Sequence, residues 1–505
     1  MTTHRKLHDS LCNPDEFTIT YELVPGPGSS GRRIERLLEF AASAHQDGRI
    51  KALSITDNPG GHPALAPEAI GSEVRRIGIE PLIHFSLKDK NRNQVESQLF
   101  HHNRQHFRTL LIMGGDYPRS AYYGQAKPVY DLDSVQMLRL MKDMEEGNYQ
   151  KHFKGSTSSP ERLSMYGGCV VSPFKTTQIE QYLQYGKLIK KVRAGARFIV
   201  TQLGYDCLKF TELMEFTQRV GINVPILANV FIPSLGVARI MARGKIPGIV
   251  FPERLLQCME EEKKTGQGEE QRLERGAKLI VVLRSMGYSG VHIGGNNLDF
   301  DKVCYLLNRA EELWEHRENL HKDVHFPVKN TWYSKDESQL VKRYGPHFSS
   351  GKLHNIIHNF LFAPKGKGAR LFGKFCRLCG SASWSNNLFI FIEAVIKKLL
   401  FSCQMCGDCT LAYSAYLCPQ SGCPKKLLNG PCGGSRHNYC EVYPDRYCFW
   451  VKVYRRLGDN VEIEQLGNEP ILPPKDWSLE NSSSWINYFC DQGHVCLSKQ
   501  KEFES

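Results

Sequence analysis

The chain has 505 residues, more than one hydrophobic core usually supports, so we expect two or more domains. Its 41% hydrophobic and 23% charged residues are typical of a folded globular protein and exclude a disordered chain. The formal net charge of +12 favours anionic partners but selects no class among them. No stretch reaches the ~18 uncharged apolar residues of a membrane span and the start lacks a secretory signal, so we expect a cytoplasmic protein without a membrane partner.

The first 325 residues have the pattern of a barrel. Short apolar runs, such as those at 17–23, 50–56 and 80–86, alternate with longer amphipathic segments that end in glycine. Such runs are typical of buried parallel strands, and the segments between them have helical spacing. Eight units in about 310 residues predict an α/β fold, a (β/α)8 TIM barrel. A doubly wound sheet is the alternative, although "LLIMGGD" at 110–116 is not the GxGxxG turn of a dinucleotide fold.

In a barrel of this kind, catalytic groups lie at the carboxyl ends of the strands. The polar side chains that the sequence places at those ends are Glu22, Thr56, Asp57, His84, Asp116 and Gln202. We therefore expect these side chains to share one mouth of the barrel.

Six motifs in chain order carry a resemblance to a known family. They are "YELVPGPG", "SITDNP", "IHFS", "MGGDYP", "AGARFIVTQLGYD" and "ILANVFIPS". Together they resemble the methylenetetrahydrofolate reductases, flavin-dependent TIM barrels, over roughly residues 15–315. The resemblance implies that reduced flavin passes a hydride to 5,10-methylenetetrahydrofolate and gives 5-methyltetrahydrofolate, for one-carbon metabolism and methionine supply. It implies NAD(P)H or a redox protein as electron donor and no nucleic-acid partner, and it leaves the oligomeric state unknown.

The resemblance assigns roles to three residues near the substrate. Glu22 matches the acid that protonates a folate nitrogen, and an acid that works near neutral pH needs a raised pKa, which an apolar barrel mouth can provide. Asp116 matches an aspartate beside the flavin ring and the folate, and Gln202 matches an amide on the pterin edge. The chain departs from many relatives at Gly114, where an arginine often stands, and this puts the contact to the flavin phosphate or ribityl chain in doubt.

The flavin itself is expected to be FAD, with FMN as the alternative. The positions carried over as flavin contacts are Thr56, Asp57, His84, Gly115, Asp116, Tyr130, Asp131, Ser172 and Lys191. Among them Lys191 would meet a phosphate, although "KLIKK" is equally compatible with a solvated helix face.

The composition changes beyond residue 325. Residues 326–400 read as a polar linker followed by helical and basic segments, and residues 401–505 as a cysteine-rich domain. Twelve of the 17 cysteines lie in the C-terminal part of the chain, from Cys376 onward. In a reducing compartment these thiols are expected to stay reduced or to bind metal rather than to form disulfides.

Eight cysteines are candidate metal ligands: Cys403, Cys406, Cys409, Cys418, Cys423, Cys432, Cys440 and Cys448. The C-x2-C-x2-C triplet from Cys403 to Cys409 favours an iron-sulfur cluster of the [4Fe-4S] type. Zinc is the alternative, and eight ligands are enough for two sites.

The cysteine-rich segment also resembles a known domain. "CQMCGDCTL" and "CPKKLLNGPCGGSRHNYCEV" are similar to the domain that accompanies these reductases in some bacteria and archaea. The rival interpretation is a basic zinc module that binds nucleic acid or protein, supported by "KGKGARLFGKFCR". That interpretation leaves the barrel without a role.

Overall fold

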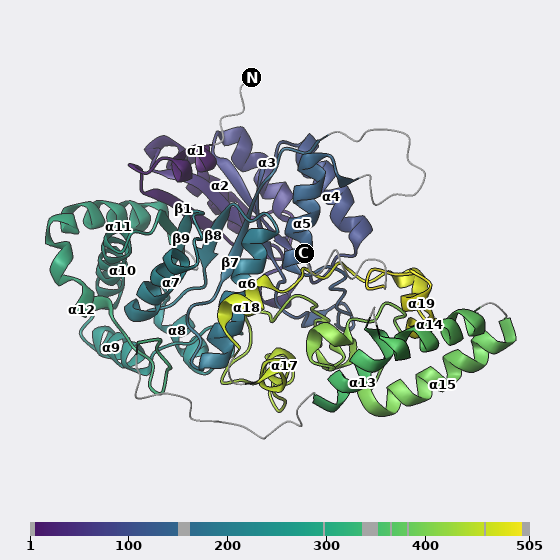
Figure 1. The fold of residues 1–505 in the computed structure, drawn as a ribbon. Helices are drawn as coiled ribbons and strands as arrows, with labels where there is room; N and C mark the ends of the chain where they lie inside the picture. Colours follow the sequence, from purple (N-terminus) through teal and green to yellow (C-terminus); the bar gives the residue numbers. More distant parts are fainter. Residues whose placement is uncertain are drawn as a thin grey trace.

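The computed structural model describes residues 6–149, 162–295, 298–335, 352–363, 366–380, 383–458 and 461–496. Eight parallel strands close into a barrel in the order β1-β10-β9-β8-β7-β4-β3-β2 (Figure 1). The strands are β1 (Thr18–Leu23), β2 (Ile50–Ile55), β3 (Glu80–Ser86), β4 (Thr109–Met113), β7 (Tyr166–Val171), β8 (Phe198–Thr201), β9 (Ile226–Phe231) and β10 (Gly290–Gly294). The predicted TIM barrel is therefore confirmed, and the doubly wound sheet is excluded.

Helices surround the barrel and bury the outward face of its strands. They are α2 (Arg32–Asp47), α3 (Pro67–Ile77), α4 (Arg92–Arg104), α5 (Ser134–Glu146), α6 (Gln178–Arg193), α7 (Cys207–Arg219), α8 (Leu235–Ala242), α9 (Glu253–Lys264), α10 (Gly268–Ser285) and α11 (Phe300–Leu313). A small hairpin of β5 (Ser120–Ala121) and β6 (Gly124–Gln125) follows β4. Asp133 begins α5 with a capping box, which explains why this helix starts sharply after a polar loop.

The lumen of the barrel divides into an apolar end and a polar end. Inward residues such as Ala52, Leu82 and Leu227 form a buried cluster with Leu7 and Leu11 of α1 (Lys6–Cys12), which closes the amino ends of the strands. Because side chains alternate along a strand, the residues two and four positions further along also face the lumen. At those positions the sequence changes from apolar to polar, so the open mouth lies at the carboxyl ends.

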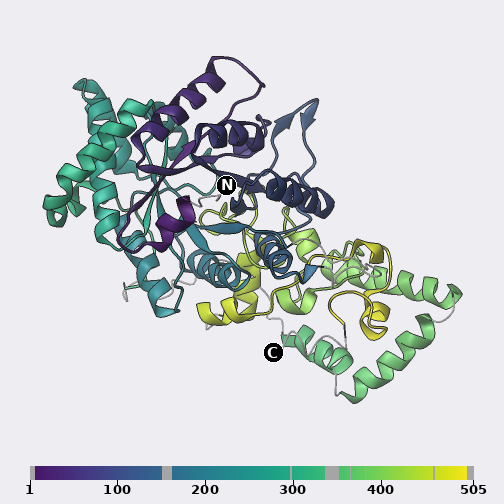
Figure 2. The same cartoon turned by 90° about the horizontal axis from the view of Figure 1, so that it is seen from above.

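The C-terminal region folds as a largely helical, cysteine-rich unit against the barrel. Its helices are α13 (Lys352–Phe362), α14 (Lys367–Gly380), α15 (Ser383–Phe401), α16 (Pro419–Gly422), α17 (Phe449–Leu457), α18 (Ile463–Asn468) and α19 (Ser484–Phe489), whereas the short α12 (His321–Val324) packs on α10 of the barrel. α17 and α18 pack against α6, whereas α13, α14 and α15 project away from the barrel (Figure 2). None of the helices in the described ranges is long and apolar enough to cross a membrane.

Buried polar contacts lock the two parts together. Asp133, only 2% exposed, accepts hydrogen bonds from the backbone N–H of Asn429 at 2.9 Å and from its side-chain amide at 3.1 Å. The ammonium of Lys187 donates to the carbonyl of Gly430 at 3.1 Å, and the amide of Gln184 donates to the carbonyl of Cys432 at 2.8 Å. Since these buried polar groups are paired with one another across the interface, we infer that the cysteine-rich unit packs stably on the barrel.

Candidate active site and cysteine sites

Glu22 meets two histidines at the mouth of the barrel. The carboxylate of Glu22, at the end of β1, lies 3.9 Å from Nε2 of His292 on β10. Nδ1 of His292 is 2.9 Å from the hydroxyl of Thr20, and Nε2 of His84 on β3 is 2.6 Å from the hydroxyl of Ser54. The ligand atoms of Glu22, His84 and His292 all lie within 4.8 Å of one another. The structure thus brings the predicted Glu22 and His84 together.

The sequence analysis missed His292 and Thr20. His292 lies 270 residues after Glu22 within the apolar run "GVHIG" of β10 and stands at an inward position of that strand. The closing pair of strands, β1 with β10, brings it beside Thr20, and the two are directly paired in the register. A lone histidine in an apolar strand is a weak signal, and strand alternation combined with barrel closure would have been needed to find it.

The pKa of Glu22 is shifted downward, whereas the sequence predicted an upward shift. Burial raises the pKa of Glu22, but the hydrogen bond from His292 and the positive potential of His84 and His292 outweigh it and lower the pKa overall. For His84, burial disfavours the imidazolium and lowers the pKa to about 4. The apolar neighbours of Glu22 along the chain led to a wrong prediction of the direction of its pKa shift, because groups on other strands of the lumen determine that shift.

Four buried side-chain atoms at the mouth have no hydrogen-bond partner among the described residues. They are Thr56 Oγ1, Ser86 Oγ and Ser172 Oγ, at or just after the carboxyl ends of β2, β3 and β7, and Asn229 Oδ1, in the carboxyl half of β9. A buried polar group without a partner costs roughly 1–3 kcal/mol, so four at one mouth indicate a polar ligand that supplies the missing bonds. Thr56 and Ser172 were predicted as flavin contacts, whereas Ser86 and Asn229 were not.

Asp116 and Gly115 form the turn after β4. The carboxylate of Asp116 accepts the backbone N–H of Gly60 at 2.9 Å. Gly115 has φ of 78°, and a Cβ there would lie 2.0 Å from Ser86 Oγ, so only glycine fits this close approach. At Gly114 an added Cβ would meet no atom within 4 Å, so the structure has space for a side chain at this position.

Three predicted cofactor residues are engaged by the protein's own groups. Asp57 pairs with Lys90 at 2.5 Å. Asp131 pairs with Arg92 at 3.0 Å. Lys191 is buried on α6 and donates to the carbonyl of Val170 at 2.6 Å, and burial lowers its pKa to about 8.

The remaining predicted residues lie near the mouth. Gln202 follows β8 and is partly exposed, and its side-chain oxygen accepts the N–H of Leu203 at 2.9 Å. The hydroxyl of Tyr130 lies 3.4 Å from the carbonyl of Gly115.

The cysteine-rich unit reaches the same mouth. The buried ammonium of Lys425 donates to the carbonyl of Gly115 at 2.9 Å and forms an ion pair with the buried carboxylate of Glu441. An open cleft beside this pair is lined by Asp116, Tyr117 and Glu441, among others. The C-terminal unit therefore helps to shape the wall beside Asp116.

The first four cysteines line one pocket. Cys403, Cys406, Cys409 and Cys418 surround it together with Lys397 of α15 and Lys475. The loop that carries the triplet is tight, because Gly407 has φ of 70° and a Cβ there would lie 2.0 Å from the carbonyl of Leu479.

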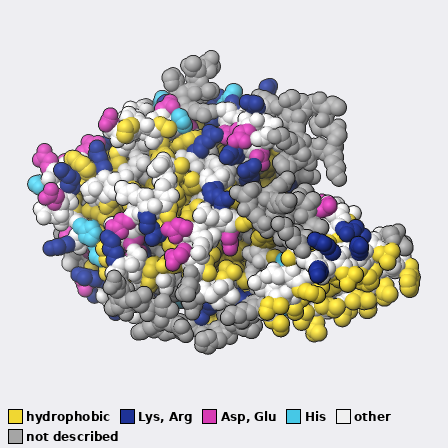
Figure 3. All heavy atoms as spheres, viewed as in Figure 1, with side chains coloured by type: hydrophobic (Ala, Val, Ile, Leu, Met, Phe, Trp, Pro, Cys, Tyr) yellow, Lys and Arg dark blue, Asp and Glu magenta, His cyan; other side chains and the backbone are white. Residues whose placement is uncertain are grey.

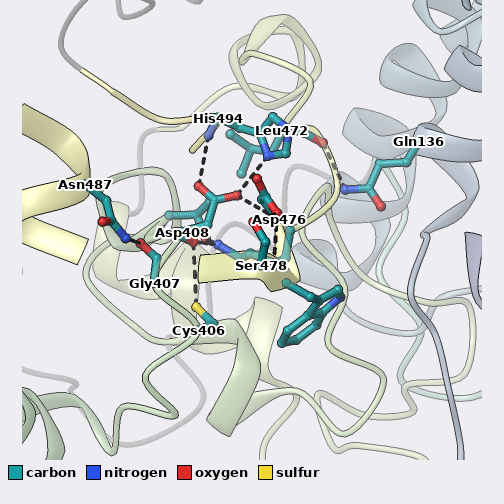
Figure 4. A network of polar contacts seen from close by, with 12 residues as sticks. Gln136, Cys406, Gly407, Asp408, Leu472, Asp476, Ser478, Asn487 and His494 are labelled. Atoms are coloured by element: carbon teal, nitrogen blue, oxygen red, sulfur yellow. Dashed lines mark hydrogen bonds and ion pairs between the residues drawn. The ribbon is translucent and has the colours of Figure 1, made fainter. Parts of the chain in front are cut away.

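Asp408, inside the triplet, holds this loop in place (Figure 4). Its carboxylate is 2.9 Å from Nδ1 of His494 and accepts the backbone N–H of Asp476 at 3.2 Å. Burial raises the pKa of Asp408, but His494 and Lys475 outweigh burial and bring it to about 2. Asp408 thus ties the cysteine loop to two segments some 70 and 90 residues further along the chain.

The other four cysteines form a second set. Backbone N–H groups point at their sulfurs: those of Lys425 and Leu427 at Cys423, that of Gly434 at Cys432, and those of Trp450 and Val451 at Cys448. Burial raises the pKa of the Cys432 thiol to about 12. Cys440 lies close enough to Cys423, and both Cys423 and Cys432 lie close enough to Cys448, for each to raise the pKa of its neighbour's thiol. N–H donors to sulfur stabilise thiolates, so the donor set suits a metal.

None of the 17 cysteines, all of which lie in the described ranges, is joined to another by a disulfide, and the candidate metal ligands are openly spaced. Four thiolates on one zinc ion lie ~3.8 Å apart, since each Zn–S bond is about 2.3 Å long in a tetrahedron. The tight groups of potential ligands in the described part of the chain are Glu22–His84–His292 and Cys207–His321–His325, and the two cysteine sets are not among them.

Comparison with known proteins agrees with this division of the chain. The methylenetetrahydrofolate reductase family matches residues 6–298, and a family described as methylene-tetrahydrofolate reductase C terminal matches residues 382–478. A methylenetetrahydrofolate reductase 1 from Schizosaccharomyces pombe is 25% identical over 57% of this chain and 45% of its own length. A methylenetetrahydrofolate reductase (NADH) 1 from Arabidopsis thaliana is 21% identical over 72% of this chain and 63% of its own length.

The similarities cover only part of the curated relatives. The chain spans less than half the length of the S. pombe relative. A solved structure from Clostridium thermocellum, described as binding two copies of 5-methyl-5,6,7,8-tetrahydrofolic acid, matches with a TM-score of 0.41 and 12% identity over 61% of this chain and 99% of its own. The match over residues 6–298 covers more than half of the sequence, and the chain belongs to the methylenetetrahydrofolate reductase family.

Proposed function

We propose that this protein reduces 5,10-methylenetetrahydrofolate to 5-methyltetrahydrofolate, in one-carbon metabolism. The observation that carries the proposal is the mouth of the barrel, where Glu22, His292 and Thr20 share the lumen with the unpartnered hydroxyls of Thr56 and Ser172. A bound flavin supplies the hydride when present. Thr56, Ser86, Ser172 and Asn229 would hold this cofactor or the folate by hydrogen bonds to their free atoms.

Glu22 would act as the acid only when the mouth is covered. Its side chain is 21% exposed, and water at this exposed part helps to keep the carboxylate ionised. A folate ring that displaces this water strengthens desolvation and shifts the pKa of Glu22 upward. His292, held by Thr20, stays close enough to pass a proton to the carboxylate.

Asp116 would stabilise cationic charge that develops on the substrate. Its carboxylate is held by Gly60 N–H at the turn after β4, beside the cleft between the two parts of the protein. A fixed negative charge in such a site favours an iminium without reorganisation at the moment of reaction. Gln202 would contact the pterin edge.

The cysteine-rich unit would hold two metal sites. Cys403, Cys406, Cys409 and Cys418 line one pocket, and two buried cations beside it, Lys397 and Lys475, offset the negative charge of bound thiolates. The C-x2-C-x2-C spacing and the open arrangement favour an iron-sulfur cluster there. The second set, with its N–H donors to sulfur, would take zinc or a second cluster. The unit would relay electrons from a redox protein or support a barrel that uses NAD(P)H.

The test is a half-reaction measured without the physiological donor. The full chain is purified anaerobically, assayed for flavin, iron, zinc and sulfide, and reduced with dithionite. Reoxidation of the flavin by methylenetetrahydrofolate, with 5-methyltetrahydrofolate as product, supports the proposal. A protein that binds flavin but is not reoxidised by this folate would contradict it. A colourless zinc protein retained on nucleic acid would favour the rival binding module.

A further inference from the structure

The helical arm formed by α13, α14 and α15 exposes an apolar surface that the proposed reaction does not use. Figures 1 and 2 show the arm projecting away from the barrel, and Figure 3 shows hydrophobic side chains gathered over α13 and α15 at its outer edge. More than half of the exposed large apolar side chains in the described ranges belong to this arm. Isolated exposed apolar residues are common on proteins, but a continuous patch of this kind marks an interaction surface.

Each helix of the arm presents its own apolar stripe to solvent. On α13 the stripe is Leu353, Ile356, Ile357 and Phe360, at the helical spacing i, i+3, i+4, i+7. On α15 it includes Trp384, Leu388, Phe391, Ile392, Val395 and Leu399. The exposed fractions are 79% for Trp384, 66% for Phe391 and 84% for Leu399. These stripes face solvent. The arm is attached to the rest of the C-terminal unit through another surface, where Ala369, Gly373 and Cys376 of α14 pack against α19.

The charges around this surface have one sign. Between 353 and 401, the exposed charged side chains of the described residues are Lys367, Arg370, Lys374, Arg377 and Lys398. The single acidic residue there, Glu393, is fully buried in an ion pair with Lys397 at 2.7 Å. On α14 the basic residues Arg370, Lys374 and Arg377 recur every three or four positions, one residue before exposed Leu371, Phe375 and Leu378. The rim of the apolar surface is therefore purely cationic.

We propose that the arm docks the protein on a lipid bilayer with anionic headgroups. Amphipathic helices with Trp, Phe and Leu on one face and Lys or Arg beside it lie in the plane of a membrane interface. Anionic lipids attract such a rim, with about a fivefold gain in affinity for each Lys or Arg near the surface. A second copy docked symmetrically on the same face would place like charges together, which argues against self-association. The proposal departs from the expectation that the chain has no membrane partner, and it is independent of the proposed reaction.

The bilayer would lie close to the first cysteine site. Lys397 and Phe401 of α15 line the pocket that holds Cys403, Cys406, Cys409 and Cys418, and Cys403 follows α15 by two residues. Docking through the apolar side of α15 would thus place this pocket, and not the barrel mouth, beside the membrane surface.

Vesicle flotation with the full chain tests the proposal. The protein is mixed with vesicles of phosphatidylcholine alone or with 30% phosphatidylglycerol, and we expect flotation with the anionic vesicles that weakens as salt rises. Phe391→Glu with Leu399→Glu should abolish it, and Arg370→Glu with Lys374→Glu and Arg377→Glu should reduce affinity by at least about 100-fold. Ile240→Glu, on exposed α8, is the matched control and should float like the wild type. Melting curves check that the variants fold.

A second readout reports insertion directly. Brominated acyl chains quench tryptophans that enter the bilayer, and Trp384 is the tryptophan on this surface. We expect quenching of the wild type that Trp384→Phe removes. Absence of flotation, or flotation unchanged by Phe391→Glu with Leu399→Glu, would overturn the proposal. A dimer in light scattering that those substitutions disperse would also overturn it, because the face would then bind a second copy. A stable complex with an acidic protein that blocks vesicle binding would overturn it as well.

Discussion

The barrel mouth and the cysteine-rich unit each bring several reactive side chains together, but they do so in different ways. At the mouth, Glu22 and His292 come from the first and last strands and meet only because the sheet closes. In the cysteine-rich unit, three candidate ligands come from seven consecutive residues, and a tight loop around Gly407 brings them together. The mouth depends on topology, whereas the first cysteine site depends mainly on local spacing.

The two regions also differ in what stabilises them. The barrel has a continuous core of strand and helix side chains, of which Leu53, Ile83 and Phe210 are fully buried. The cysteine-rich unit has a smaller core around Trp450 and Tyr454 and relies on polar contacts such as those of Asp408 and Asp133. Small units of this kind usually need metal to be stable. Loss of a ligand should therefore unfold the unit, whereas loss of a catalytic group in the barrel should leave the fold intact.

Cys406→Ser should produce the largest effect. Metal binding contributes about 10 kcal/mol or more to folding in small metal-dependent domains, and oxygen is a poor substitute for thiolate. We expect loss of iron and proteolysis between residues 403 and 448, with flavin still bound to the barrel. Metal analysis and limited proteolysis measure this, with exposed Cys12→Ser as the control. Unchanged metal content and proteolysis would show that the triplet does not bind metal, and the proposed difference in stabilisation between the two regions would then be wrong.

Glu22→Gln should leave the structure intact and slow the folate half-reaction. The amide cannot donate a proton to the folate nitrogen, and general acid catalysis is typically worth about 10²- to 10⁴-fold. Stopped-flow reoxidation of the reduced flavin by methylenetetrahydrofolate measures the rate. Glu35→Gln, exposed on α2, serves as the control. A rate close to that of the wild type would show that Glu22 is not the acid.

Lys425→Met probes the contact between the two regions. It leaves the carboxylate of Glu441 buried without its partner, and breaking a buried ion pair in this way costs about 3–5 kcal/mol. We expect the cysteine-rich unit to melt at lower temperature than the barrel. Adding Glu441→Gln should recover part of the loss, because the uncompensated charge is removed. If the single variant melts in one transition like the wild type, the interface is less important than the buried pair indicates.

His84 should give the smallest effect, visible as a pH dependence of stability. The unfolded chain binds the proton of this histidine near pH 6.5, but the folded protein binds it only near its pKa of about 4. Falling pH therefore favours the unfolded state, and stability drops between pH 6.5 and 4 by up to about 3 kcal/mol from this residue.

The difference between wild type and His84→Gln isolates that contribution from the other histidines. Urea unfolding at pH 7, 6 and 5 should show the two proteins converging as pH falls. A stability difference that does not change with pH would show that folding leaves the pKa of His84 unshifted. Glu22, whose pKa is lowered, loses its stabilising charge only below about pH 4.5, so it does not disturb the measurements at pH 7, 6 and 5.

The sequence by itself determined the barrel, the placement of Glu22, Thr56 and His84 at one mouth, and the grouping of the triplet cysteines. These features follow from local rules, since strand runs, strand ends and ligand spacing are all read within a few residues. Tertiary structure alone decided the partners of Glu22, the direction of its pKa shift and the contact of Lys425 with Gly115, because each depends on groups about 270 to 310 residues apart. It also decided that the apolar faces of α13 and α15 point to solvent, since an amphipathic pattern specifies a face but not what covers it.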